Sequence, residues 1–583
     1  MMKISVVITT YNRRLQLEQC LRSLEAQSLP ASEFETIVVA DGCTDGSNDF
    51  LTTYRPPYIL RWLSQANLGQ PAAQNAGVAL AAGEIVLFLD DDCICDEKLL
   101  EAHCKAHARA ERIVAIGAVL LHSKSPKGIL HDVKKKQREI ELRQLATEAP
   151  DPRNLMLCAN TSIVRSAVLH LPFDTTYTRL HDVEAGIRLW AAGYKPFSVP
   201  EAIVYERFSK NVTEVLRDCW NQGKFEVILT RNHPAVKPIS CIARAATSNP
   251  IKRTIVKGLV KHPTLGETVL CPVYWLGDRL RFFPPFAWLA KRTLAARARG
   301  AHLQGAARAA GSWKNLETAF YRRVPVIMYH NVGQPRPGEY PGLTTPTAKF
   351  TAQIRFMAKM GYTGITPREW LRWRDEAATL PERPVMLVFD DAYADASRNA
   401  FPLLEQLGWG AACMVVTGYI GATNRWDEID NLPSQQLMSA DEIRAWAKRG
   451  IEFGGHTCHH VDLRNASDEI AEQEIARCKA DLTALLASEP ASFAYPYGGV
   501  SAAACAAAQK HFKLAFTTWP GLLHLGVAPH LTPRIGFMPG ETRIGIRIHL
   551  RWGKNPYVSL HDRCIALLDI TRRKVATLSE RFQ

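Results

Sequence analysis

Two apolar segments that have the pattern of buried strands end in consecutive aspartates, about 300 residues apart. Asp90, Asp91 and Asp92 close the segment EIVLFLDDDC. Asp390 and Asp391 close the segment LVFDDAY. In α/β folds, ligands bind beyond the carboxyl ends of the strands, and carboxylates placed there can hold a divalent cation. The sequence therefore predicts two separate metal or sugar sites.

The chain of 583 residues is too long for one hydrophobic core, because domains usually contain about 100–200 residues. Strand-like and helix-like patterns alternate over residues 1–235, and a second alternation starts at VPVIMYH, residues 324–330. This alternation predicts an α/β fold with a mostly parallel sheet in each half. The predicted segments are an N-terminal domain (1–235), a basic and aromatic linker of helical character (236–322), a second domain (323–545) and a basic extension (546–583).

Basic residues are concentrated in the segment 236–322. It holds 15 Lys and Arg against three Asp and Glu, a net charge of +12, whereas the whole chain carries +14. Basic and aromatic residues together suit an anionic membrane surface. The alternative is a solvated linker with basic helices. A nucleic-acid binder is disfavoured, because the charge is confined to one segment without a nucleic-acid motif.

The cysteine pattern and the N-terminus bear on the compartment. The fourteen cysteines are scattered without a CxxC pair, which argues against a disulfide framework and favours a reducing cytoplasm. The start, MMKISVVITTYNRR, lacks the cleavage site of a signal peptide. No window reaches the ~18 apolar residues that a membrane span needs. We expect a cytoplasmic protein that contacts the inner face of the membrane through 236–322.

Four motifs follow one another in the first half: SVVITTYNR, VADGCTDGS, NLGQPAAQNAGVALAAGEIVLFLDDDC and RLHDVEAGIRLWAAGYK. This series, over roughly residues 3–230, resembles the family 2 glycosyltransferases of the GT-A fold. The resemblance implies a Rossmann-like domain that transfers a sugar from a nucleotide sugar with inversion. It implies that Thr10 and Tyr11 line the nucleotide pocket and that Asp41 binds the base. Asp90 and Asp92 would form the DxD pair, with Asp92 nearest to a Mg or Mn ion.

The last of these motifs implies the acid–base residues of the transfer. Asp182 would be the general base that deprotonates the acceptor hydroxyl, with Glu184 close by, because inversion needs in-line attack. The alternative for Asp182 is an acid that merely complements the dipole of a helix N-terminus. Glu206 stands where many relatives have a histidine, so the sequence does not fix the full set of metal ligands in this domain.

In the second half, FGGHTCHHVDL supplies His456 and His460 downstream of the paired aspartates. Successive side chains of a strand point in opposite directions, so Asp390 and Asp391 can take separate roles. Two histidines four residues apart share one face of a helical turn. Two His and one Asp with an open position form a catalytic zinc-type set.

The order VMLVFDDAY, GGHTCHHVDL, FAYPYGG resembles the polysaccharide deacetylases of carbohydrate esterase family 4, the NodB homology domains, over roughly residues 322–545. The resemblance implies a distorted (β/α) barrel that hydrolyses an N-acetyl group of an amino sugar. Asp390 would be the general base, and Asp391, His456 and His460 would bind Zn or another divalent transition metal. Tyr497 would offer its backbone N–H to the oxyanion.

Two departures from that pattern concern the supporting residues. The arginine common in the third motif is Ala494 here, and Arg534 is the candidate to stand beside Asp390 instead. The usual late Leu-x-His motif is replaced by HLTPRIGF. The candidates for the general acid are His330, His524 and His530, with a core or surface histidine as the alternative for each.

The sequence thus predicts a bifunctional carbohydrate enzyme, a glycosyltransferase joined to an N-deacetylase. Its expected partners are a nucleotide sugar donor and a glycan or lipid-linked acceptor, and no nucleic acid. The alternative is a chain in which one domain is catalytic and the other binds carbohydrate or regulates.

Overall fold

A computed structural model describes residues 2–145, 159–246, 250–339, 342–376, 378–430, 434–537 and 540–553. The chain forms two compact units. Unit 1 combines Met1–Asn232 with Asn249–Asn315, and unit 2 combines His233–Ser248 with the chain from Leu316 onward. The segment 236–322, predicted as a separate linker, is therefore divided between the two units, because its helices pack onto them. Among the described residues, none of the helices is long and apolar enough to cross a membrane.

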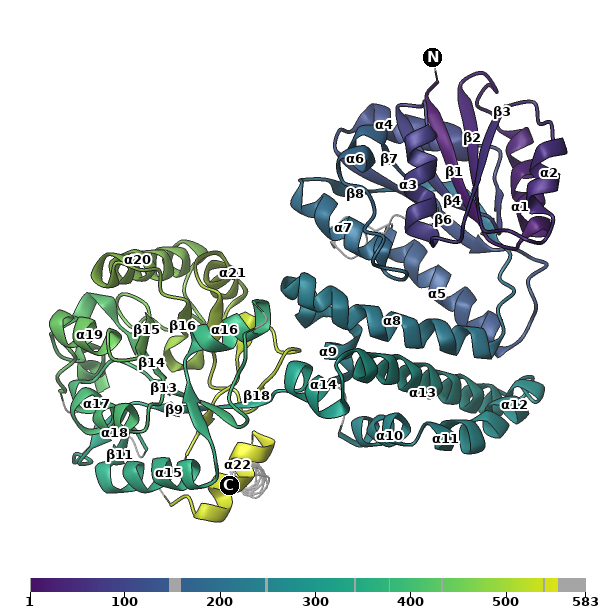
Figure 1. Cartoon of the computed structure of the whole chain (residues 1–583). Coiled ribbons are helices and arrows are strands. Elements are labelled where there is room, and N and C mark those ends of the chain that lie inside the picture. The colour runs from purple at the N-terminus through teal and green to yellow at the C-terminus, as the bar shows by residue number, and fades with distance from the viewer. Residues whose placement is uncertain are drawn as a thin grey trace, which may run out of the picture. The chain divides into compact units, whose positions relative to one another are not determined.

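Unit 1 is built on an eight-stranded mixed sheet with the order β3-β2-β1-β4-β7-β6-β8-β5 (Figure 1). β1 to β4 pair in parallel, whereas β7 and β5 run antiparallel to their neighbours. The alternation of strands and helices predicted for residues 1–235 is confirmed among the described residues. The strands are β1 Ile4–Thr10, β2 Phe34–Asp41, β3 Ile59–Gln65, β4 Ile85–Asp90, β5 Cys93–Cys95, β6 Ile113–Leu121, β7 Thr161–Val164 and β8 Lys195–Glu206.

Helices cover both faces of this sheet because its central strands are apolar on both sides. In β1, Ile4 and Val6 pack in a core with α1, α2 and α4, whereas Val7 packs with α3, α6 and α7. The helices are α1 Arg14–Ser23, η1 Leu24–Ala26, α2 Ser47–Thr53, α3 Gln70–Leu80, α4 Leu99–Arg109, α5 Ile129–Leu145, α6 Arg165–His170 and α7 His181–Ala191.

A layer of helices completes unit 1, with α13 beside α8 (Figure 1). Two glycines permit their close approach. A Cβ atom at Gly223 would lie 1.8 Å from the carbonyl oxygen of His302, and one at Gly305 would lie 1.8 Å from that of Trp220. The basic segment is thus helical, as predicted. The helices are α8 Val212–Asn232, α10 Pro250–Lys261, α11 Pro263–Leu265, the π-helix η4 Gly266–Leu270, α12 Cys271–Arg279 and α13 Pro284–Ala309.

Unit 2 is a distorted barrel. Its main strands run in the order β17-β16-β15-β14-β13-β9, and β19 pairs in parallel with β9. At the other edge, a parallel bridge between Phe516 and Thr532 joins β17 to the segment before β19. This closes the ring and confirms the predicted (β/α) barrel. The strands are β9 Val324–Tyr329, β10 Asn331–Gly333, β11 Thr344–Pro346, β12 Thr363–Ile365, β13 Pro384–Phe389, β14 Ala411–Val415, β15 Ile451–Gly455, β16 Ser492–Ala494, β17 Leu514–Phe516, β18 Leu522–Leu523 and β19 Ile535–Gly536.

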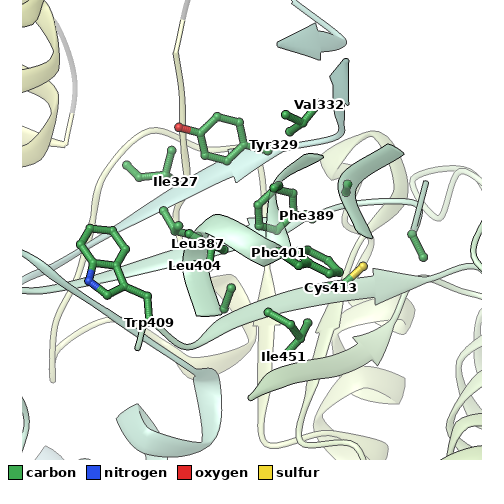
Figure 2. Close-up of a cluster of buried hydrophobic side chains, with 14 of the residues drawn as sticks. Ile327, Tyr329, Val332, Leu387, Phe389, Phe401, Leu404, Trp409, Cys413 and Ile451 are labelled. Carbon is green, nitrogen blue, oxygen red and sulfur yellow. The ribbon is translucent and has the colours of Figure 1, made fainter. Parts of the chain in front are cut away.

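The core of unit 2 lies between the barrel strands and their helices. Leu387 and Phe389 of β13 meet Phe401, Leu404 and other buried side chains (Figure 2). The helices are η3 Pro234–Ile239, α9 Cys241–Ala246, α14 Trp313–Phe320, α15 Thr347–Lys359, α16 Pro367–Asp375, α17 Ala394–Asn399, α18 Phe401–Gln406, η5 Thr417–Tyr419, η6 Arg425–Asp430, α19 Ala440–Ala447, α20 Asp468–Leu486, η7 Pro496–Gly498, α21 Ala502–His511, η8 Pro529–Leu531 and α22 Arg543–Trp552.

The predicted boundary between residues 545 and 546 falls inside α22. Ile546 and Leu550 of this helix belong to the core of unit 2, so the barrel unit extends beyond the predicted end. The rest of the predicted C-terminal extension, residues 554–583, lies outside the described residues.

Candidate functional sites

Unit 1 has a pocket of about 420 Å³ beyond the carboxyl ends of β1, β2 and β4. It brings together six residues singled out in the sequence. The predicted residues that line it are Thr10, Tyr11, Asp41, Asp90, Asp92 and Glu206. The other lining residues are Thr9, Arg13, Gln70, Asp91, Thr178, Arg179 and Lys210.

Asp41, at the end of β2, fixes the loop that leads into α3. Its Oδ1 accepts hydrogen bonds from Gln65 Nε2 at 2.8 Å and from the backbone N–H of Leu68 at 2.9 Å. Its Oδ2 accepts one from the N–H of Gly69 at 2.9 Å. Asp41 thus shapes the wall of the pocket and keeps acceptor capacity at Oδ2.

Two of the three acids at the end of β4, Asp91 and Asp92, are paired with Arg13, which the sequence analysis did not single out. Arg13 Nη1 lies 2.9 Å from Asp91 Oδ1 and 3.1 Å from Asp92 Oδ2. The hydroxyl of Thr10 donates to Asp91 Oδ2 at 2.7 Å. Both oxygens of Asp91 are therefore bonded within the protein, whereas Asp92 is bonded at Oδ2 and keeps Oδ1 for a ligand.

Burial and the neighbouring Asp92 and Asp91 raise the pKa of Asp90 to about 7. Burial raises the pKa of Asp92 to about 6, although Arg13 opposes the shift. The cluster thus holds more negative charge than its surroundings stabilise, which a cation would relieve. Carboxylate oxygens are the donors that Mg and Mn prefer, so the residues present fit such an ion.

Glu206 lies at the end of β8 and faces α5. Its Oε2 accepts from Arg138 Nε at 3.1 Å, and Lys134 Nζ lies 3.9 Å from its Oε1. In this structure two cations of α5 balance its charge.

The structure does not bring Asp182 and Glu184 into the pocket of unit 1. Asp182 lies in the first turn of α7, where its Oδ1 accepts from the N–H of Val183 at 2.9 Å. Glu184 is buried and forms an ion pair with Arg188 at 2.8 Å. The pocket is lined instead by Thr178 and Arg179, just before this helix.

In unit 2, Asp391, His456 and His460 present ligand atoms that all lie within 4.8 Å of one another. Asp391 Oδ1 is 3.4 Å from His456 Nε2 and 3.2 Å from His460 Nε2. Within the described parts of the chain, this is the one cluster of at least three His, Cys, Asp or Glu residues with such spacing. All three side chains are buried.

Backbone geometry and hydrogen bonds orient the two imidazoles. His456 Nδ1–H donates to the carbonyl oxygen of Ala494 at 2.8 Å, which leaves the lone pair of Nε2 directed at Asp391. His460 Nδ1 is 3.1 Å from the hydroxyl of Tyr497. The helical turn expected for these histidines is wrong: they lie in a loop after β15, where Thr457 (φ 63°) and His460 (φ 59°) have left-handed backbone.

The donor set fits a zinc-type ion on two observations. Two imidazoles and one carboxylate are the ligands of many catalytic zinc sites. Asp391 Oδ1 is buried without a hydrogen-bond partner, a costly state that an ion would remove. Burial alone would raise the pKa of Asp391, but His460 and His456 hold it well below its usual range.

Asp390 occupies the other side of this site and pairs with the predicted Arg534. Arg534 Nη1 donates to Asp390 Oδ1 at 2.7 Å, and Arg534 Nε donates to the carbonyl oxygen of Thr517 at 2.8 Å. His330 Nε2 lies 3.8 Å from Asp390 Oδ2. Burial alone would raise the pKa of Asp390. The positive charges of Arg534, His456 and His330 hold this pKa below its usual range.

The three candidates for the general acid differ in place. His330 contacts Asp390, as described. The ring of His530 bonds the carbonyl oxygen of Phe512 at 2.8 Å, and His524 Nδ1 accepts from the N–H of Gly526 at 3.1 Å. His330 is therefore the candidate that the structure places at the site.

Two aromatic residues frame the same site. Tyr497 has left-handed backbone (φ 57°), a costly conformation for a residue other than glycine. Trp426, which the sequence analysis missed, stacks on His460 with 4.6 Å between ring centroids. Trp426 lies outside the three deacetylase-like motifs, so no sequence signal marked it.

The sequence matches two family models. Residues 5–168 match the family described as "Glycosyl transferase family 2", and residues 377–513 match "Polysaccharide deacetylase". The chain joins a family 2 glycosyltransferase domain to a polysaccharide deacetylase domain. Unit 1 contains the transferase domain and unit 2 the deacetylase domain.

Among curated proteins, the chain is similar to "Putative polysaccharide deacetylase YxkH" of Bacillus subtilis (strain 168), with 23% identity over 39% of this chain and 75% of that protein. It is also similar to "Validoxylamine A glucosyltransferase" of Streptomyces hygroscopicus subsp. jinggangensis (strain 5008), with 26% identity over 40% of this chain and 62% of that protein. Among solved structures, the deacetylase PplD of Streptococcus pyogenes in complex with acetate shares 24% identity, with 40% of this chain and 99% of that chain covered and a TM-score of 0.35.

Proposed function

We propose that the chain has two enzymatic activities: inverting transfer of a sugar from a nucleotide sugar, and metal-dependent hydrolysis of an N-acetyl group on an amino sugar. One observation carries the second activity. Three buried donor atoms of Asp391, His456 and His460 converge beside the Asp390–Arg534 ion pair, which provides a metal site and a base in one place. The first activity is supported by the acid-lined pocket of the transferase domain.

In the deacetylase domain, Asp390 is the base that accepts the proton of the attacking water. Arg534 and the nearby histidines keep it ionised, so it is ready at neutral pH. A divalent transition metal, such as zinc, held by Asp391, His456 and His460 supplies activation of that water and of the amide carbonyl. The backbone N–H of Tyr497 donates to the developing oxyanion. His330 gives a proton to the departing amine.

In the transferase domain, Asp41 and the side chains of Thr10 and Tyr11 receive the nucleoside. Mg or Mn held by Asp92, with Asp90 close by, supplies charge neutralisation for the diphosphate that departs. Arg179 and Lys210 line the same pocket and share Asp218 as an ion-pair partner, so together they add one net positive charge. Asp182 is the general base for the acceptor hydroxyl, with Glu184 and Glu206 as accessory acids. Asp182 lies outside the pocket in this structure, so this role requires α7 to approach the pocket when donor and acceptor bind.

The substrates follow from these two activities. The acceptor is a glycan or a lipid-linked sugar, in the biosynthesis of a cell-surface polysaccharide or glycolipid. The nucleotide sugar places the transfer in the cytoplasm, and the basic segment 236–322 gives peripheral contact with the inner face of an anionic membrane.

Single-site variants test the two activities separately. Acetate release from N-acetylated chitooligosaccharides with added zinc is expected to disappear in Asp390→Asn and to persist in Asp92→Asn. Nucleotide release from nucleotide sugars with an amino-sugar acceptor is expected to show the reverse. If either activity is absent from the unaltered chain across a panel of substrates, the alternative of one catalytic domain and one binding module holds.

A further inference from the structure

Exposed apolar side chains gather at one place in unit 1. The described residues include 21 large hydrophobic side chains that are exposed, and eight of them lie within the 21 residues from Val269 to Leu289. They belong to η4, α12, the turn that follows and the first turns of α13. This aromatic patch consists of Val269, Trp275, Leu276, Phe282, Phe283, Phe286, Trp288 and Leu289.

The exposure of this patch is unusual for a folded domain. Phe282 is 80% exposed, Phe283 60% and Trp288 56%. The three phenylalanines of the patch are the only exposed phenylalanines among the described residues. Large exposed apolar patches mark sites of interaction with a partner or a membrane.

Arginines accompany the aromatic rings. The guanidinium of Arg279 lies 4.2 Å from the ring centroid of Trp275, that of Arg281 lies 5.0 Å from Phe282, and that of Arg292 lies 4.3 Å from Trp288. From residue 263 to 299 the sequence has six Lys and Arg and two Asp and Glu. One of these acids, Asp278, is occupied in accepting the N–H of Ile129 at 2.7 Å. The patch therefore suits a partner that is both apolar and anionic.

We propose that the aromatic patch inserts into the interface of an anionic lipid bilayer. Its rings would lie at the boundary of headgroups and acyl chains, and its arginines would contact lipid phosphates. A bilayer fits better than a protein partner, because Phe282 and Phe283 protrude from a turn and a fluid interface needs no complementary groove. The inference narrows the membrane contact of the proposed function to eight residues and places it on the transferase unit.

The patch is connected to the transferase pocket through α5. Asp278 of α12 holds the N-terminus of α5, and Lys291 of α13 lies 3.9 Å from Asp132 of the same helix. One to two turns further along α5, Lys134 and Arg138 engage Glu206 at the pocket. One helix thus contacts both the elements that carry the patch and an acid that lines the pocket.

Vesicle flotation of the full chain tests the proposal without any substrate. We expect binding to phosphatidylcholine vesicles that contain phosphatidylglycerol, and release at high salt. Arg279→Gln/Arg281→Gln/Arg292→Gln should weaken binding on the order of 100-fold, since each basic residue contributes roughly five-fold at an anionic surface. Phe282→Ser/Phe283→Ser should weaken it about 10-fold or more. Both variants change exposed side chains, and circular dichroism checks their folding.

Matched controls lie in unit 2. Trp519→Ser removes an exposed ring, and Arg372→Gln/Arg444→Gln/Arg477→Gln removes three surface arginines. Both are expected to bind vesicles as the unaltered chain does. The proposal is overturned if the unaltered chain does not float with anionic vesicles, or if the patch variants float equally well. It is also overturned if they instead abolish self-association seen by light scattering, since the patch would then join two copies. Because no sugar is present, failure of the proposed activities would leave this result unaffected.

Discussion

Arg534 and Asp390 form an ion pair in the interior of the deacetylase domain, with 2.7 Å between Nη1 and Oδ1, although 144 residues separate them in the chain. Both side chains are almost fully buried, at 1% and 3% exposure. A buried carboxylate keeps its charge only when a partner offsets the lost hydration. The third deacetylase motif has Ala494 where an arginine is common. In this chain the arginine beside Asp390 is Arg534, which comes directly before β19.

Arg534→Gln is expected to lower the free energy of unfolding of unit 2 by roughly 3–5 kcal/mol, because it leaves Asp390 buried without a charged partner. It should also raise the pKa of Asp390. Since the base acts as a carboxylate, the acidic limb of the deacetylation profile should move to higher pH. Urea unfolding and a pH–rate profile measure both effects.

The control for this variant is Arg464→Gln, which removes an exposed arginine paired with Asp462. Exposed pairs are screened by water, so stability and pH profile should stay as they are. Equal unfolding midpoints for Arg534→Gln and the unaltered chain would contradict the role given to the buried pair.

Tyr497→Phe is expected to weaken zinc binding by about 10-fold or more, because the hydroxyl beside His460 Nδ1 orients that ligand. Its backbone N–H remains, so turnover at saturating zinc should fall far less. Competition with a chromophoric chelator measures the affinity. Tyr495→Phe, which removes a hydroxyl bonded to the carbonyl of His530, should leave the affinity unchanged. Identical affinities in both variants would remove Tyr497 from the metal site.

The sequence predicted the strands well, and the three residues proposed as deacetylase ligands do converge in the structure, for a local reason. Apolar runs such as β13, buried at all six positions, are visible in a short window, and the ligands directly follow such strands. The order of motifs then brought Asp391 and the two histidines together, although their backbone geometry was misjudged. Left-handed residues such as Thr457 leave no pattern in the sequence.

Several long-range contacts escaped the sequence analysis, although it named Arg534 as a partner of Asp390. Arg13 meets Asp91 across 78 positions, and Trp426 stacks on His460 from η6, a segment without a motif. The division of the segment 236–322 depends on the close crossing at Gly223 and Gly305, which only the packed helices show. Such pairings depend on the whole fold, because no local propensity encodes them.

Asp91 and Asp92 are expected to respond differently to replacement by asparagine, although burial raises the pKa of both carboxyl groups. Thr10 and Arg13 bond both oxygens of Asp91, whereas Arg13 bonds one oxygen of Asp92. Asp91→Asn loses acceptors for Thr10 and Arg13 and should lower the free energy of unfolding by about 1–3 kcal/mol. The pKa of Asp92 is raised above its unfolded value, so its ionisation opposes folding at neutral pH. Asp92→Asn should therefore be at least as stable as the unaltered chain, while sugar transfer falls on the order of 100-fold or more. Thermal unfolding and a transfer assay check the pair. A destabilised Asp92→Asn would show that this acid has a structural role.

A buried hydrogen-bond network in unit 1 has one consistent proton assignment when His103 is neutral. Asn160 Nδ2 donates to the carbonyl oxygens of Ala118 and Ala202, so its Oδ1 accepts from His103 Nε2–H at 2.8 Å. His103 Nδ1 then accepts from the hydroxyl of Ser162 at 2.8 Å. That oxygen accepts from His107 Nε2–H at 2.9 Å. A second ring proton on His103 would donate to the oxygen of Ser162 and turn its hydroxyl toward His107 Nε2. Burial lowers the pKa of both rings and therefore favours the assignment with neutral His103.

Burial lowers the pKa of His103 and of His107 to about 4. The unfolded chain takes up these protons below the ordinary value of 6.5, whereas the folded chain does so only near 4. The stability of unit 1 should therefore fall between these pH values as the pH drops, by about 1.4 kcal/mol per pH unit for each histidine. His103→Gln should reduce this slope by the contribution of one histidine, about 1.4 kcal/mol per pH unit, even if the variant also changes the absolute free energy of unfolding. Urea unfolding at several pH values, followed by hydrogen exchange in peptides that cover α4 and β7, measures the slope. His170→Gln, at the exposed end of α6, is the control, and an equal slope in His103→Gln and in this control would contradict the assignment.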